Sequence, residues 1–173
     1  MEEKNTIQLK KLSKNELYSA LDVFFNNAGF EIKDFTDFER NRKYLLSKNN
    51  ELFTITVLIK NICDCGWKDR KNIKRIQVLK MQKPQRTTKE QCFLLLGLTN
   101  VNGNNILVAW NPLKYIYHEK NRSAYVYDEA LFEANKKGFY KTIQNGEKIL
   151  ISNEENFEEL LKEYYAYSYV EEI

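Results

Sequence analysis

Apolar side chains near the start of the chain recur at helical intervals. From Leu17 onward they return every three or four residues, the spacing of one face of an α-helix. Ser13 and Glu16 stand in capping-box spacing just before this run, and Gly29 follows it. The pattern predicts an amphipathic helix over residues 14–28.

The middle of the chain changes to the period of β-strands. Residues 52–60 alternate between apolar and polar positions and are rich in β-branched and aromatic side chains. A short apolar run at 92–98, an Asn102-Gly103 turn and a second apolar run predict a β-hairpin. The segment 30–50 admits either a strand or a helix. Seven strands are expected, over residues 52–60, 75–81, 92–98, 106–110, 114–117, 123–128 and 147–152.

Two further helices complete the expected elements. One spans residues 128–137, with acidic residues first and lysines last, as suits the helix dipole. The other follows Ser152 and Glu155, which again have capping-box spacing. Short strands without alternating long helices favour a mixed, mainly β fold, a seven-stranded open pseudobarrel of mostly antiparallel strands with flanking N- and C-terminal helices. We expect a single domain with an N-terminal helical extension (1–49), a pseudobarrel core (50–152) and a C-terminal helix (153–173).

Length and composition fit one ordered globular domain. The chain has 173 residues, of which 43% are hydrophobic and 29% charged. It contains no apolar run that could span a membrane and no signal-peptide core, so we expect a cytoplasmic protein without a membrane partner. An odd, sparse set of cysteines argues for a reducing compartment. Cys63, Cys65, Cys92 and His118 are too scattered for a typical zinc site, so no metal or other cofactor is expected.

Charge is distributed unevenly along the chain. The net charge is only +3, but residues 60–90 carry ten basic against three acidic side chains. Residues 153–173 carry seven glutamates and one lysine. A basic middle and an acidic tail indicate that one part of the chain meets a polyanion and another does not.

Catalytic motifs are scarce. The chain has one histidine, and no nucleophile elbow or phosphate loop occurs. Glu31 and Lys33, two apart, resemble the acid–lysine pair of magnesium-dependent nucleases, but the nearest extra carboxylate, Asp22, falls on the first helix. We therefore expect a binding domain rather than an enzyme, and keep a nuclease as a less favoured alternative.

Two polar connections between expected strands carry the candidate binding residues. The first, "DCGWKDRKNIKR", combines five cations with a tryptophan and a glycine, and the second, "NPLKYIYHEKNRS", mixes cations with aromatic and amide side chains. Lysines would neutralise phosphates, while Arg and Asn can read base edges. The expected DNA-binding residues are Trp67, Lys68, Asp69, Arg70, Lys71, Asn72, Lys74, Arg75, Lys114, Tyr117, His118, Lys120, Asn121, Arg122 and Ser123.

The order of these elements resembles the B-three-like DNA-binding pseudobarrel. The basic connection before "RIQV", the hairpin "CFLLLGLTNVNGNNILVAW" and "GFYK" before a last strand are similar to the recognition domains of restriction endonucleases of the EcoRII, BfiI and NgoAVII type. The chain looks most like the N-terminal domain of the LlaJI McrB-type restriction subunit. The resemblance covers residues 50–152 and implies that residues 64–75 and 111–123 are arms that enter the major groove.

This resemblance implies site-specific recognition of double-stranded DNA as the targeting domain of a bacterial restriction system. The expected partners are double-stranded DNA, a GTPase or nuclease portion after the C-terminal helix, and a partner nuclease subunit. One alternative is a reader of a modified, extruded base, which needs an aromatic-lined pocket. Another is a protein-interaction module whose basic patch meets an acidic partner.

Overall fold

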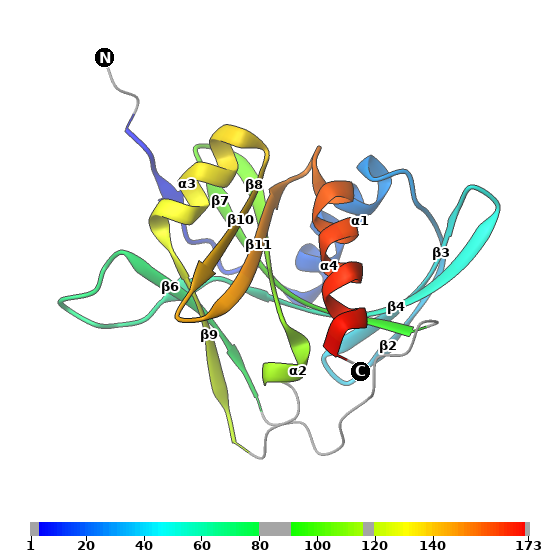
Figure 1. Cartoon of the computed structure of the whole chain (residues 1–173), viewed down its shortest axis with the longest axis horizontal. Coiled ribbons are helices and arrows are strands. Elements are labelled where there is room, and N and C mark those ends of the chain that lie inside the picture. Colours follow the sequence, from blue (N-terminus) through cyan, green and yellow to red (C-terminus); the bar gives the residue numbers. More distant parts are fainter. Residues whose placement is uncertain (1–3, 80–90, 116–119, 172–173) are drawn as a thin grey trace.

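The computed structural model describes residues 4–79, 91–115 and 120–171, and within them two β-sheets and four helices (Figure 1). The helices are α1 (Lys14–Asn27), α2 (Pro112–Tyr115), α3 (Asp128–Lys137) and α4 (Phe157–Glu171). The strands are β1 (Ile7–Gln8), β2 (Glu31–Phe38), β3 (Asn41–Lys48), β4 (Glu51–Asn61), β5 (Cys63–Asp64), β6 (Ile73–Val78), β7 (Gln91–Val101), β8 (Asn104–Trp110), β9 (Arg122–Tyr127), β10 (Phe139–Gln144) and β11 (Glu147–Asn153).

The larger sheet has the order β10-β11-β8-β7-β4-β3-β2, with β1 pairing to β7. Its pairs are antiparallel except for β4 and β7, which run parallel. The smaller sheet has the order β5-β6-β9. The fold class is confirmed as mainly β, with open sheets and flanking helices, and the part of the chain that the structure describes holds eleven strands rather than seven.

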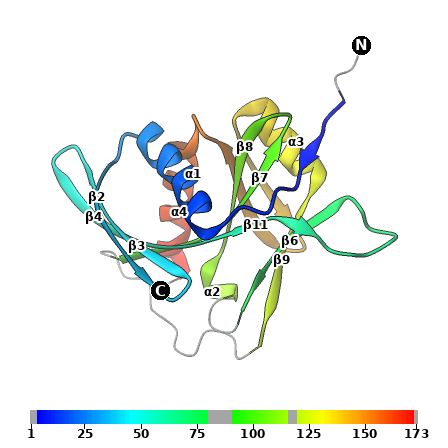
Figure 2. The ribbon, with the colours of Figure 1, turned by 180° about the vertical axis from the view of Figure 1, so that it is seen from behind.

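Alternation along β7 and β8 divides the core into two clusters. Leu94, Leu96 and Leu107 face one side of the larger sheet, where α1 and α4 cover them. Leu95 and Val108 face the opposite side, where the smaller sheet and α3 pack (Figure 2). Strands β7 and β8, at the centre of the larger sheet, are therefore buried on both faces, which explains the continuous apolar run in β7.

The N-terminal helix follows its prediction closely. Ser13 caps α1, its Oγ accepting from the backbone N–H of Glu16 at 3.2 Å, and Glu16 completes the capping box. Gly29 follows the helix with a φ of 89°. The Asn102-Gly103 hairpin between β7 and β8 is also confirmed, with both residues at positive φ.

Several other expectations are corrected. Residues 31–48 are not part of a helical extension, because β2 and β3 form a hairpin that continues the larger sheet next to β4. Of the strand expected over 114–117, residues 114–115 lie in the short helix α2, as Pro112 at its first position favours, and residues 116–117 lie outside the described residues. Strand β10 was not predicted. Ser152 lies inside β11 rather than capping α4, and Asn153 accepts from the backbone N–H of Asn156 at 3.0 Å.

None of the helices described here is long and apolar enough to cross a membrane.

Gly97 in β7 lets the two sheets approach each other. A Cβ at this position would lie 2.8 Å from Cγ1 of Ile62, 2.9 Å from Cζ3 of Trp110 and 3.0 Å from Cγ2 of Ile76. These three side chains are buried, so none can move aside into solvent. The absence of a side chain at Gly97 therefore sets the spacing at which the smaller sheet packs.

We expect Gly97→Ala to lower the free energy of unfolding by about 1–3 kcal/mol, the usual cost of overpacking a core. Urea unfolding followed by circular dichroism measures the change. The double variant Gly97→Ala/Ile62→Ala should lose less than the sum of the two single variants, because removal of the Ile62 side chain makes room for the new methyl group. Additive losses would contradict a steric origin at Gly97.

Candidate nucleic-acid interface

The smaller sheet presents one apolar and one polar face. Strands β6 and β9 pair antiparallel, with Arg75 opposite Tyr125. Because successive side chains of a strand point to opposite faces, Ile76 and Val126 enter the core. The register therefore places Arg75 and Tyr125 together on the other face of the sheet, and Arg75 donates to Ser123 Oγ at 3.3 Å.

The first basic connection joins β5 to β6 and folds back on this polar face. Gly66 has a φ of 75°, which favours glycine. The Trp67 ring then stacks on Tyr125, with 5.6 Å between ring centroids and 28° between planes. The Arg70 guanidinium lies over Trp67 at 5.5 Å from the ring centroid. Lys68, Asp69, Lys71 and Asn72 are exposed along the same connection.

Lys74 lies in β6 rather than in the connection, and its side chain is only 7% exposed. Its ammonium contacts both carboxylate oxygens of Asp128, at 2.8 and 3.0 Å, and donates to the Lys71 carbonyl at 2.8 Å. Asp64 lies 3.5 Å away. Lys74 thus fixes the end of the basic connection against the start of α3, instead of projecting from a loop as predicted.

The second connection is described only in part. Tyr117 and His118 lie outside the described residues. Lys114 stands at the end of α2, and Lys120 and Asn121 are exposed before β9. Arg122 Nη1 donates to the Lys114 carbonyl at 3.5 Å, which joins the two ends of this connection.

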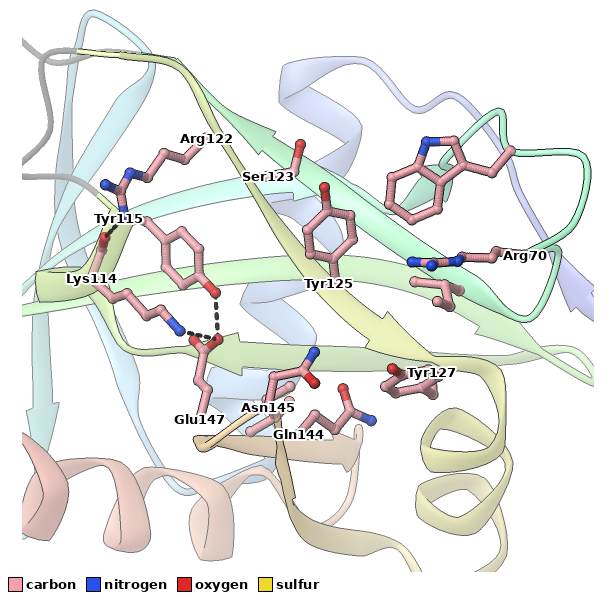
Figure 3. Close-up of a pocket in the computed structure, with 13 residues that line it drawn as sticks. Arg70, Lys114, Tyr115, Arg122, Ser123, Tyr125, Tyr127, Gln144, Asn145 and Glu147 are labelled. Atoms are coloured by element: carbon pink, nitrogen blue, oxygen red, sulfur yellow. Dashed lines mark hydrogen bonds and ion pairs between the residues drawn. The ribbon is translucent and has the colours of Figure 1, made fainter.

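A pocket of about 370 Å³ lies where the two connections meet (Figure 3). Its lining brings together side chains of both connections, the polar face of β9 and the turn between β10 and β11. The lining residues are Trp67, Arg70, Ile73, Lys114, Tyr115, Arg122, Ser123, Tyr125, Tyr127, Gln144, Asn145, Glu147 and Ile149. Five of the predicted residues, Trp67, Arg70, Lys114, Arg122 and Ser123, therefore share one cavity.

Glu147 is the buried acid of this pocket, 9% exposed. Figure 3 shows Lys114 and Tyr115 pointing to its carboxylate. Oε2 accepts from the Tyr115 hydroxyl and from Lys114 Nζ at 3.2 Å. Burial, followed by the hydrogen bond to Glu147, raises the pKa of Tyr115 above its ordinary range, so its hydroxyl stays protonated and donates.

Sequence reasoning missed the pocket residues that come from other elements. Tyr125 and Tyr127 belong to the expected strand 123–128 but not to the expected DNA-binding residues, although their spacing of two indicates a shared face. Gln144 lies in β10, which the sequence pattern does not predict, whereas Glu147 begins the expected strand 147–152 but has no partner segment in the sequence to mark it as a pocket residue. The Asn145-Gly146 dipeptide could have indicated the β10–β11 hairpin, because Asn-Gly favours a two-residue hairpin turn. Both residues have positive φ in the structure.

The other candidate sites lie elsewhere. Glu31 and Lys33 form an exposed ion pair of 3.1 Å on β2, while Asp22 accepts a hydrogen bond from Tyr44 at 2.9 Å. Within the described ranges, no group of three or more His, Cys, Asp or Glu side chains is placed to hold a metal ion. Burial raises the pKa of the Cys65 thiol, which disfavours the thiolate that metals bind.

A sequence model of one protein family, described as methylase-associated X1, matches residues 53–161, which is well over half of the chain. The chain belongs to the methylase-associated X1 family. This membership links it to restriction–modification systems. The matched region of this methylase-associated domain begins in β4 and ends in α4, and so contains both basic connections and every residue of the pocket. Comparisons with curated proteins and with solved structures gave no match.

Proposed function

We propose that this methylase-associated domain recognises specific sites in double-stranded DNA for a restriction–modification system, using the two basic connections as arms. The observation that carries the proposal is that cationic side chains from both connections meet at one pocket. Arg70 comes from the first connection and Lys114 and Arg122 from the second, yet all three line one pocket. Cations that converge from separate segments create the local positive potential that attracts a phosphate backbone.

The two arms combine groups for positioning with groups for reading. Lys68, Lys71 and Lys120 are exposed, and would contact phosphates as flexible point charges. Arg70 is held against the Trp67 ring, so its planar guanidinium is oriented before DNA arrives. An oriented guanidinium suits bidentate contact with guanine O6 and N7 in the major groove. Lys74, buried in its ion pair, is assigned to holding the first arm in place.

The paired glutamates of the acidic C-terminal helix lie away from the proposed DNA surface. Glu158 pairs with Lys48 at 3.1 Å, and Glu163 pairs with Lys148 at 3.1 Å and Lys141 at 3.4 Å. Lysines therefore partly neutralise these glutamates, which lie on the side of the larger sheet that α1 and α4 cover. The proposed DNA surface lies on the opposite side of that sheet, with β6 and β9.

Fluorescence anisotropy with a randomised duplex pool, followed by selection and sequencing of the bound fraction, tests the proposal. We expect binding that weakens as salt rises and that enriches a defined motif. Absence of binding at low salt would contradict DNA recognition and favour an acidic protein partner. Salt-sensitive binding without enrichment would leave a DNA-binding surface but contradict site specificity.

Two single variants separate positioning from reading. Lys71→Ala should weaken binding to all duplexes about equally and reduce the slope of log K against log salt by about 0.9. Arg70→Ala should instead flatten sequence preference, with about 1–3 kcal/mol of discrimination lost at one base position. Lys162→Ala on α4, where the side chain is 73% exposed, is the matched control and should change neither quantity. Indistinguishable effects of the two arm variants would contradict the division of roles.

A further inference from the structure

The pocket between the arms contains a buried acceptor that receives no hydrogen bond from the described residues. Glu147 Oε2 receives two donors, from Tyr115 and Lys114, whereas Oε1 is buried and no donor in the described part of the chain reaches it. Gln144 Oε1, from the end of β10, is buried and unpaired in the same way. A buried acceptor without a partner is costly, so a ligand that donates a hydrogen bond at this point gains affinity.

The walls of the pocket suit a flat ring. Tyr115, Tyr125 and Tyr127 line it, and Trp67 stacks on Tyr125 at its edge. Aromatic side chains stack on nucleobases of any sequence. The volume of about 370 Å³ is at the small end of the range for ligand pockets, which is enough for one nucleotide unit but not for a paired duplex.

The charged residues at this pocket suit the backbone on either side of such a base. Arg70, Lys114 and Arg122 belong to the pocket lining and come from the two arms proposed to hold DNA. Arg122 is exposed, and the Lys114 side chain is 45% exposed, so both retain access to phosphates outside the cavity. Since Glu147 is nine-tenths buried, a base stacked inside a duplex cannot reach it.

From this geometry we infer that the pocket receives a single base extruded from DNA, and that Glu147 selects bases that carry an exocyclic amino group. The inference rests on the proposed DNA binding and adds a base-specific subsite to it. Adenine, cytosine and guanine can present an amino N–H to Glu147 Oε1. Thymine has no amino group, and its ring N–H is flanked by two carbonyl oxygens that would face the carboxylate. The Gln144 amide can rotate to donate or accept, so selection falls to Glu147.

Duplexes with one unpaired base test the inference, because a base opposite an abasic site is extruded at little cost. Affinities are measured for duplexes of one sequence with A, C, G or T opposite the abasic site, for the fully paired duplex, and for the free nucleoside monophosphates. We expect the amino-bearing bases to bind about tenfold more tightly than thymine and than the paired duplex, a factor that corresponds to about 1.4 kcal/mol.

Glu147→Gln should abolish the preference over thymine, because an amide can turn its own N–H toward the ligand. Tyr125→Ala should weaken binding of all four unpaired duplexes more than binding of the paired duplex, because only an extruded base would stack on this ring in the pocket. Glu163→Gln, an acid on α4 that pairs with Lys148, is the matched control and should behave as the native chain. Thermal melting of each variant shows whether it is folded, and the base preference of the native chain tests the inference without any variant.

Each of the other possible binding results contradicts a different part of the inference. If the native chain binds paired and unpaired duplexes equally, extrusion is overturned while DNA recognition stands. Equal affinity for thymine and the amino-bearing bases overturns selection by Glu147. Free nucleotides that bind as tightly as the unpaired duplexes, with the same loss in Glu147→Gln, assign the pocket to a free nucleotide instead. No binding of any DNA at low salt overturns both this inference and the proposed function.

Discussion

Replacing Trp110 with alanine should lower the free energy of unfolding by about 3–5 kcal/mol, the range measured for large aromatic side chains in cores. Trp110 is fully buried at the end of β8. Its indole Nε1 donates to the Tyr125 carbonyl at 2.9 Å, and thereby ties the larger sheet to β9 of the smaller one. The alanine variant loses this hydrogen bond and leaves a large cavity between the sheets. Urea unfolding followed by circular dichroism measures the loss.

Two companion variants define the origin of this effect. Trp110→Phe keeps most of the apolar ring but leaves the Tyr125 carbonyl without its donor, so a loss of about 1–3 kcal/mol is expected. Ile143→Ala on β10, where the side chain is 72% exposed, should change stability by less than about 0.5 kcal/mol. A Trp110→Ala loss as small as that of Ile143→Ala would show that the sheets do not depend on this contact.

Sequence patterns predicted strands that bury at least one face. Strand β4 has Ile55, Val57 and Ile59 in one core cluster, so its alternation is clear. Strand β2 is the opposite case. It is an edge strand whose residues are almost all exposed, and Phe35 and Phe38 remain 48% and 58% exposed. No buried face imposes alternation there, so its sequence could not distinguish a strand from a helix.

The sequence could not predict which distant strands pair with one another. Strand β4 runs parallel to β7, so the chain between them must cross over, and β6, which lies in this crossover, pairs with β9 in the smaller sheet. Such pairing depends on the packing of whole elements rather than on local propensity. The pocket follows from it, because Tyr125 and Glu147 are brought together only when the β10–β11 turn lies beside the smaller sheet.

Charge alone also could not reveal which cations are structural. Lys71 and Lys74 stand three residues apart in one basic segment and look alike in sequence. In the structure Lys71 is exposed, whereas Lys74 is buried against Asp128, an acid 54 residues later in the chain. The composition of the arms was therefore predictable, but the division between binding and structural cations depended on tertiary contacts.

Loss of Asp128 removes the closest carboxylate from the buried Lys74 ammonium. We expect Asp128→Ala to lower the free energy of unfolding by about 3 kcal/mol, as is typical when one partner of a buried pair is removed. The Asp128 side chain is 20% exposed and Asp64 remains 3.5 Å from Lys74, which places the value at the lower end of the range. Urea unfolding near neutral pH measures the change.

A double variant shows whether the loss comes from the stranded charge. Lys74→Met/Asp128→Ala removes both charges and keeps most of the apolar volume at Lys74, so it should be more stable than Asp128→Ala alone. Glu133→Ala, on an exposed turn of α3 where Glu133 pairs with Lys137 at 3.0 Å, is the control for a surface ion pair and should cost less than about 1 kcal/mol. Equal losses in the single and double variants would assign the effect to the start of α3 instead.

Loss of the Lys74–Asp128 ion pair should weaken DNA binding as well as the stability of the fold. Lys74 also donates to the Lys71 carbonyl, and the backbone N–H of Asp128 donates to the Asn72 carbonyl at 2.9 Å, so the end of the first arm is held at the start of α3. In Asp128→Ala the backbone bond persists but the side-chain anchor does not. The folded fraction of this variant should therefore bind DNA more weakly, with a salt slope close to that of the native chain, because no exposed cation is removed. A lower slope would instead mean that Lys74 itself reaches a phosphate when DNA is bound.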